Sequence, residues 1–576
     1  MKSKHLFIPG LLGGALLAGF AWHALAQSPA EGASAPPPSP APPPAVSASG
    51  PGQPALVNLA AYIPPQCYAQ TREARDARDA RDARDGAAPN ARPRTTVHNG
   101  CFTCHHESRP PNYVDDEDVQ TTLSFARFAT ENHWQNFLHR PAPATLDDAA
   151  LLAWVRTRNY EVDEAKSKYA RDHGGYAADA YFHFDEDGFD HAPDGHTTGW
   201  RAFAYTPFPG MFWPTNGSAG DVLIRLPEAF RQNERGEDDR AIYRLNFALL
   251  EAYIQEKDIP IPPTDERTLG ADLDGDGHLT TARRVAFRWP LRDGFAPRYV
   301  GRAKTLDPTS EGRIAAGLYP PGTEFLHTLR YLDIDPGGNV VMAERMKEVR
   351  YMRKKRWLTY SDLQLAAGEE AREKEKSPDK LKRLHGDAER GVGNGVGWVL
   401  LGYIEDRDGH LRPQSYEETV SCIGCHGGIG ATTDSTFAFA RKLGAASFRQ
   451  GWYHWRDRGL AGIHEPRRKD GKGEYAHYLT QVGGGDDYRT NDEVESRFFR
   501  ADRSLDPAAA QKLSRDIATL IVPSRERALA LNRAYVGLVR AQSFAQGREV
   551  TVGHDPRVVK EVVQDDATGI DVAVKP

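Results

Sequence analysis

The sequence predicts a mainly α-helical protein with much irregular structure and short β-hairpins. Apolar residues recur at helical spacing over Asp239–Gln255, and two further helix signals follow near the C-terminus. Strand-like runs are short, as at Val222–Leu226.

The two C-terminal helices are predicted from their first residues. Asp506-Pro507 offers a capping carboxylate and a first-turn proline for a helix that continues to Val522. Ser524 can cap the next helix, which is expected to end near Phe544.

One hairpin is predicted in the C-terminal half. Gly397–Glu405 is an apolar, β-prone run, Asp406–Gly409 is a turn signal, and the chain returns at Leu411–Pro413.

The N-terminus predicts export. Lys2 and Lys4 precede an apolar run over Leu6–Leu25, which ends at the small-residue site Ala24-Leu25-Ala26. This pattern is typical of a secretory signal peptide over residues 1–26, and a retained membrane anchor is the alternative. No later segment has the length and hydropathy of a membrane span, so we expect a periplasmic or extracellular protein.

Two low-complexity stretches accompany the folded part of the chain. Residues 27–58 are rich in proline and alanine and predict an extended linker. Residues 72–94 contain an Ala-Arg-Asp repeat of period three, which fits neither a helix face nor a strand and predicts a solvated insertion.

Cysteine spacing carries the strongest chemical signal. Four of the five cysteines form Cys101-Phe102-Thr103-Cys104-His105 and Cys422-Ile423-Gly424-Cys425-His426, and Cys67 has no obvious mate. Two thiols at this spacing can reach the two vinyl groups of one porphyrin, and the histidine that follows can bind its iron. The sequence thus predicts two haem c groups, attached at Cys101 and Cys104 and at Cys422 and Cys425, with His105 and His426 as iron ligands.

Two other interpretations of the cysteine pairs remain open. Two thiolate pairs far apart in sequence can close a four-cysteine zinc site, and each pair alone can act as a redox-active dithiol. Both leave the histidines without a role. On the haem interpretation, residues 59–390 form an N-terminal haem domain and residues 391–576 a C-terminal one.

An acidic loop over residues 272–283 is a candidate calcium site. Asp272, Asp274 and Asp276 alternate around Gly275, and the backbone carbonyl of His278 would be a further oxygen ligand. Position twelve, where a glutamate closes a calcium loop of this kind, is an arginine. An unoccupied acidic turn is the alternative.

The two pentapeptides resemble the attachment motif of c-type cytochromes, which implies cytochrome c-like haem-binding regions. More of the chain is similar to large uncharacterised dihaem proteins of Gram-negative bacteria, through Pro65–Tyr68, Thr436–Lys442 and Pro523–Ala528. More loosely, it resembles the group of dihaem peroxidases, the dihaem enzyme that matures methylamine dehydrogenase, and rubber oxygenases. The wide separation of Cys101 from Cys422 departs from that group.

The leading hypothesis is electron transfer through two haems, with a dihaem peroxidase or oxygenase that has one open iron as the alternative. A structural or sensory haem is a third. Expected partners are redox proteins or a small-molecule oxidant, and a net charge of -6 gives no reason to expect nucleic acid. For the remaining iron ligands, His454 and His477 are favoured because they follow the second motif.

Overall fold

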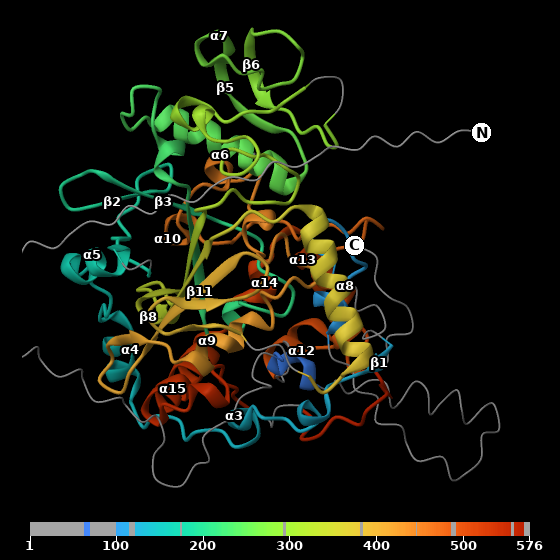
Figure 1. The fold of residues 1–576 in the computed structure, drawn as a ribbon. Helices are drawn as coiled ribbons and strands as arrows, with labels where there is room; N and C mark the ends of the chain where they lie inside the picture. Colours follow the sequence, from blue (N-terminus) through green and yellow to red (C-terminus); the bar gives the residue numbers. More distant parts are fainter. Residues whose placement is uncertain are drawn as a thin grey trace, which may run out of the picture. The chain divides into compact units, whose positions relative to one another are not determined.

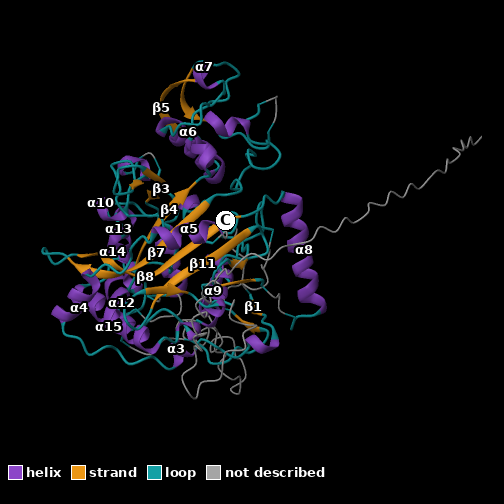
Figure 2. Cartoon of the chain, turned by 60° about the vertical axis from the view of Figure 1, so that its left-hand side comes forward, coloured by secondary structure: helices purple, strands orange, loops and turns teal. Residues whose placement is uncertain are grey.

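A nine-stranded antiparallel sheet lies at the centre of the computed structural model, which describes residues 63–69, 100–113, 121–172, 175–291, 295–380, 384–444, 446–484, 491–553 and 558–568. Its strands, in spatial order, are β2 (Phe189–His191), β3 (Thr197–Phe203), β4 (Ala219–Arg225), β7 (Glu324–Ile334), β8 (Val340–Lys354), β11 (Trp398–Glu405), β10 (Gly391–Gly393) and β9 (Gly386–Asp387), with β12 (Leu411–Pro413) paired to β11. Figure 2 shows β4, β7, β8 and β11 side by side.

The predicted mainly α-helical fold is therefore wrong, and β8 shows why. Its sequence is rich in Met, Glu, Arg and Lys, which are good helix formers. Arg345, Lys347 and Glu348 are nonetheless buried in the sheet, where Arg345 pairs with Glu405 at 2.5 Å. These buried charges are paired with residues far away in the sequence. The strand therefore lacks the regular alternation of polar and apolar residues from which it could have been predicted.

Both faces of the sheet are buried. Alternate residues of the same strands face two different hydrophobic clusters. One face packs against the helix α6 (Arg240–Gln255) and the segment around residues 420–452, through Phe203, Val222, Phe325, Met352 and Leu400. The other face packs against residues 160–182, through Trp200, Leu223, Leu326, Tyr351 and Leu401.

Helices surround the sheet, and several confirm the sequence prediction. Asp239 caps α6, and Ser524 caps α15 (Arg525–Ala541), which packs with α4 (Asp148–Arg156) against β7 and β8 (Figure 1). The helix predicted from Asp506 to Val522 is divided into α13 (Pro507–Arg515) and α14 (Ala518–Ile521). The β11–β12 hairpin is confirmed.

The remaining elements are short or peripheral. The helices are α2 (Cys101–Cys104), α3 (Gln135–Leu138), α5 (Glu164–Asp172), α7 (Glu266–Leu269), α8 (Tyr360–Lys376), α9 (Tyr416–Ile423), α10 (Trp455–Arg458), α11 (Glu474–Val482) and α12 (Asp492–Phe498). Two small sheets pair β5 (Ile259–Asp265) with β6 (Thr281–Val285) and β1 (Thr122–Leu123) with β13 (Asp566–Ala567).

The predicted segments fall differently on this structure. The signal peptide, the linker and the insertion at residues 72–94 lie outside the described residues. The described residues all belong to one compact unit. The predicted boundary at residue 390 falls between β9 and β10 of the central sheet. Within the described residues, no helix combines the length and hydropathy needed to span a bilayer.

Candidate functional site

A cavity lies over one face of the sheet, beneath the second cysteine motif. It encloses about 1050 Å³ of space between atoms, including its mouth to solvent. Strands β7, β8 and β11 provide one side through Phe325, His327, Arg350, Met352 and Leu400. The cavity is also lined by Cys422, Cys425, His426, Phe208, Met211, Phe212 and Phe437. The two cysteines and the histidine of the motif therefore line one common space.

Helix α9 positions the cysteines. Ser415 and Glu418 form a capping box at its start, and Cys422 lies in its last turn. The backbone amides of Cys425 and His426 both donate to the carbonyl of Cys422 at 3.2 Å, which holds the motif in a tight turn. Arg548 donates to the Cys422 sulfur at 3.5 Å.

His426 is held as a neutral imidazole. Its Nδ1 lies 2.7 Å from the backbone carbonyl of Ser435, and since a carbonyl can only accept, Nδ1 carries the proton. Burial lowers the pKa of His426 to about 4, partly opposed by this hydrogen bond. The Nε2 atom therefore carries the lone pair of the ring. A neutral imidazole with such a lone pair is the form of histidine that binds metals.

A second histidine, His327, lines the same cavity and was not singled out from the sequence. It lies on β7 beside the ring of Phe212, with ring centroids 5.1 Å apart. Burial lowers its pKa to about 3, and nearby Arg350 acts in the same direction. Its Nε2 is buried without a hydrogen-bond partner among the described residues.

The first motif has different surroundings. Cys101 and Cys104 bound the one-turn helix α2, whose Phe102 packs against His477 and Tyr478 of α11. Burial raises the pKa of the Cys101 thiol well above its usual value, and neighbouring Cys67 acts in the same direction. His105 is partly buried. His477, expected near the second motif, thus lies beside the first.

The structure brings the two motifs together although 321 positions separate them in sequence. The backbone amide of Ala431 donates to the carbonyl of Cys104 at 3.1 Å, and the Asn112 side chain donates to the carbonyl of Thr432. An added Cβ at Gly430 would lie 2.8 Å from the carbonyl oxygen of His106, so this crossing leaves no room for a side chain. The two motifs are parts of one region.

His454 is excluded as a ligand to a group in the cavity by its own contacts. Its Nε2 lies 2.5 Å from Asp221, and its Nδ1 accepts from the backbone amide of Arg456. The pair is buried, and Asp221 also faces Arg330 at 3.5 Å. Both ring nitrogens of His454 are occupied.

The cysteines do not form a zinc cluster in this geometry. Among the described residues, the group of three or more Cys, His, Asp or Glu ligand atoms within 4.8 Å of one another is Glu266, Asp272 and Asp274. All five cysteines are free of disulfides. The thiols of the two motifs thus do not converge on one ion.

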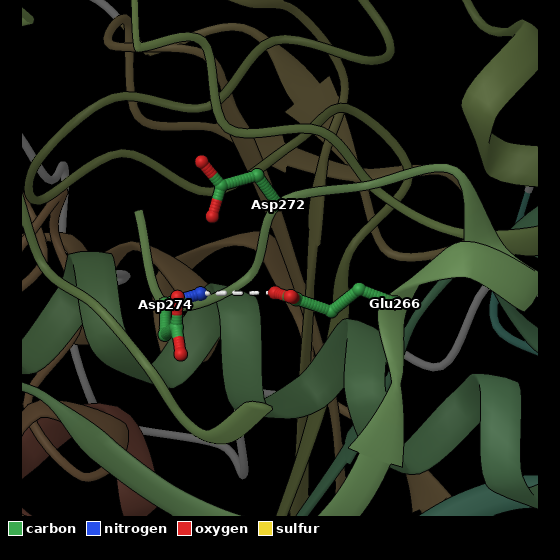
Figure 3. A group of neighbouring side chains, drawn as sticks. All are labelled: Glu266, Asp272 and Asp274. Carbon is green, nitrogen blue, oxygen red and sulfur yellow. Dashed lines mark hydrogen bonds between the residues drawn. The ribbon is translucent and has the colours of Figure 1, made fainter. Parts of the chain in front are cut away.

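The acidic loop contributes two of the three carboxylates in that group, which is drawn in Figure 3. Asp272 accepts from the amides of Gly275 and Gly277, and Asp276 accepts from the amide of His278 at 2.7 Å. The buried Glu266 of α7 accepts from the amides of Leu273 and Thr280 and was missed because it precedes the loop in sequence. Asp276 lies outside the group, and calcium binding stays a prediction.

Comparison with known proteins identifies the family. The model of a family described as "-like lipoprotein" matches residues 54–518, and the chain belongs to this lipoprotein family. A relative from Aquifex aeolicus (strain VF5), named an uncharacterized lipoprotein, is 31% identical over 517 residues, which cover 79% of this chain and 82% of the relative. No solved structure gives a significant match.

These findings correct the family and the function expected from the sequence. The chain's relatives are lipoproteins, and the resemblance to c-type cytochromes and dihaem enzymes is wrong as a family assignment. Neither description names haem, iron or electron transfer, so the electron-carrier function and its peroxidase or oxygenase alternative are not retained. Membership of a lipoprotein family agrees with the expected export. The cysteine-bound cofactors and the expected partners stay predictions.

Proposed function

We propose that this lipoprotein-family protein is an exported binding protein that holds haem covalently, with one haem in the cavity attached to Cys422 and Cys425. The observation that carries the proposal is that Cys422, Cys425 and His426 line one cavity. Aromatic side chains and the cations Arg350 and Arg548 line the same space, which suits a flat apolar ring with acidic substituents.

The attachment chemistry needs only the groups named. Each S–H adds across one vinyl C=C bond of the porphyrin, so that sulfur bonds to one carbon, hydrogen to the other, and nothing leaves. The step requires reduced thiols, and neither Cys422 nor Cys425 is in a disulfide. A bound haem would supply an iron, and His426 would hold that iron through its Nε2 lone pair, because its Nδ1 is engaged with the Ser435 carbonyl.

The same chemistry extends to Cys101, Cys104 and His105, which would hold a second haem. The contact between Ala431 and Cys104 supports two groups in one region of the protein.

We propose a periplasmic or extracellular location. The first cysteine of the chain is Cys67, so residues 1–66 offer no thiol for a lipid, and the apolar run at Leu6–Leu25 is the candidate for attachment if it is retained.

The proposal is tested by measuring the mass of the polypeptide with any covalently attached haem. The full chain, exported in a host that attaches haem to such motifs, is expected to gain two haem masses and to keep a haem stain after denaturing electrophoresis. Cys422→Ala with Cys425→Ala should lose one haem, and Cys101→Ala with Cys104→Ala the other, while Cys67→Ala keeps both. An unmodified mass with four free motif thiols would overturn the proposal.

A calcium ion at the acidic loop is a second, separate proposal. It is supported by the convergence of Glu266, Asp272 and Asp274 oxygens within 4.8 Å, because calcium prefers several carboxylate ligands. Calcium at 100 times its Kd should stabilise the fold by about 2.7 kcal/mol. Asp274→Asn should abolish the shift in Tm, and the control Asp335→Asn, in a turn between β7 and β8, should retain it. No shift in the unsubstituted protein contradicts the site.

A further inference from the structure

We propose that His327 is the second protein ligand of the group held in the Cys422 cavity, on the side opposite His426. The inference rests on the proposed function and goes beyond it, because no sequence motif marks this residue. It assigns both axial positions of that iron to imidazoles.

His327 lines the cavity from strand β7 of the sheet, whereas His426 lines it from the segment that follows α9. In the register of the sheet, His327 pairs with Val222 of β4 and with Arg350 of β8. Its neighbours two positions away on the same face include Phe325, which also lines the cavity. Among the described residues that line the cavity, His327 and His426 are the histidines. A flat group between the sheet and the motif would therefore have one imidazole from each side.

The imidazole of His327 is buried, and one of its ring nitrogens lacks the hydrogen bond that a buried polar atom requires. Its Nε2 has no partner in the described part of the protein, although buried polar atoms are nearly always paired. An added Cβ at Gly220 would lie 2.8 Å from this Nε2, and Phe212 packs on the ring. The ring is thus held closely in place while one of its polar atoms remains unsatisfied, which is the arrangement expected of a ligand whose partner is absent from the chain itself.

Met211 and Met352 also line the cavity and are the rival ligands. A thioether is apolar enough to be buried without a partner, so their burial is explained by packing alone. The burial of an imidazole is not. His454 has both ring nitrogens occupied, and His477 lies beside the first motif.

The experiment uses the full haem-loaded chain and the spin state of its irons. Optical and electron-paramagnetic spectra of the unsubstituted protein should show a low-spin iron with two imidazole ligands at the Cys422 site. His327→Gly should convert that iron to high spin, with its covalent haem mass unchanged, and added imidazole should restore the low-spin signal. Met211→Leu and Met352→Leu are matched controls and should leave the spectrum unchanged.

The outcomes separate this inference from the proposed function. A polypeptide without covalent haem overturns both. Covalent haem with an unchanged spectrum in His327→Gly, or with a high-spin Cys422-site iron already in the unsubstituted protein, overturns the role of His327 and leaves haem binding intact. Conversion caused by a methionine variant instead of His327→Gly also overturns it.

Discussion

The two cysteine motifs have the same five-residue pattern and very different settings. The second begins in the last turn of a helix with a capping box and lines a cavity over a buried face of the nine-stranded sheet. The first forms a one-turn helix without a side-chain cap and packs against α11. The comparison teaches that a motif supplies reactive groups, whereas the long-range pairing of strands supplies the space and the opposing residues.

The largest predicted effect concerns the loop that holds His426. Asp434 precedes Ser435, and its carboxylate forms a fully buried pair with Lys354 of β8 at 2.7 Å. Asp434→Ala would leave the Lys354 ammonium buried and unpaired, which should cost about 3–5 kcal/mol of unfolding free energy. Urea unfolding measures this loss.

The matched control is Lys166→Ala, which breaks a solvent-exposed ion pair to Asp163 on α5 and should leave the midpoint unchanged. If both variants had the same midpoint, the buried pair would not stabilise the second site, and the contrast between the motif settings would lose its energetic basis.

The contact between the motifs is tested by Gly430→Ala. The added Cβ would meet the backbone of His106, which can move only with the first motif, so we expect a loss of up to about 3 kcal/mol. Hydrogen exchange should show faster opening at both motifs.

Gly368→Ala in the middle of α8 is the control. Its Cβ would have the Arg372 side chain as nearest neighbour at 3.9 Å, so the change should be neutral or slightly stabilising. Opening confined to one motif in Gly430→Ala would show that the two settings are independent.

Acid should weaken the buried hydrogen-bonded pair of Asp221 and His454, which occupies the Nε2 atom of His454. Burial alone would raise the pKa of Asp221, but Arg330 and the bond to His454 outweigh it and lower the pKa from 3.8 to about 2. The unfolded chain therefore binds this proton first, and the stabilisation is complete above pH 3.8 and lost as the pH falls toward 2. It amounts to about 2 kcal/mol.

Asp221→Asn should remove this part of the acid dependence. The measurement is the unfolding free energy between pH 5 and pH 2, a range of about 3 pH units that includes the lowered pKa of Asp221. An unchanged acid profile in the variant would mean that His454 is not fixed by Asp221 and could turn toward other partners.

The smallest effect concerns the cap of α9. Ser415 accepts from the amide of Glu418, and Ser415→Ala should cost about 1 kcal/mol. Thr359→Ala removes the equivalent capping box of α8 and should cost a similar amount. Only Ser415→Ala is expected to reduce haem attachment at Cys422, and equal attachment in both variants would show that the cap does not position the motif.

Short-range signals predicted local structure correctly. The α6 and α15 helices and the β11–β12 hairpin follow from capping residues and periodicity over short windows. The central sheet could not be predicted in this way, because its strands bury charges such as Lys347 that are satisfied by distant residues. Helix-forming residues in β8 added a misleading local signal.

The residues of the candidate site also fall into two groups: those that local sequence patterns predict and those that only the fold brings together. The motif residues could be recognised from spacing, and the structure adds that Cys422, Cys425 and His426 share a cavity. His327 could not be found, because its place depends on the register of β4, β7 and β8 and it is one of 20 histidines. Glu266 was missed because it reaches the acidic loop from the preceding helix.

The central claim is that Cys422 and Cys425 hold a haem in the cavity, and peptide mass spectrometry tests it most directly. After proteolysis of the exported protein, the peptide that contains Cys422 and Cys425 should carry one haem mass and have no thiol that reacts with iodoacetamide. The same peptide with its unmodified mass and two reactive thiols would contradict the account.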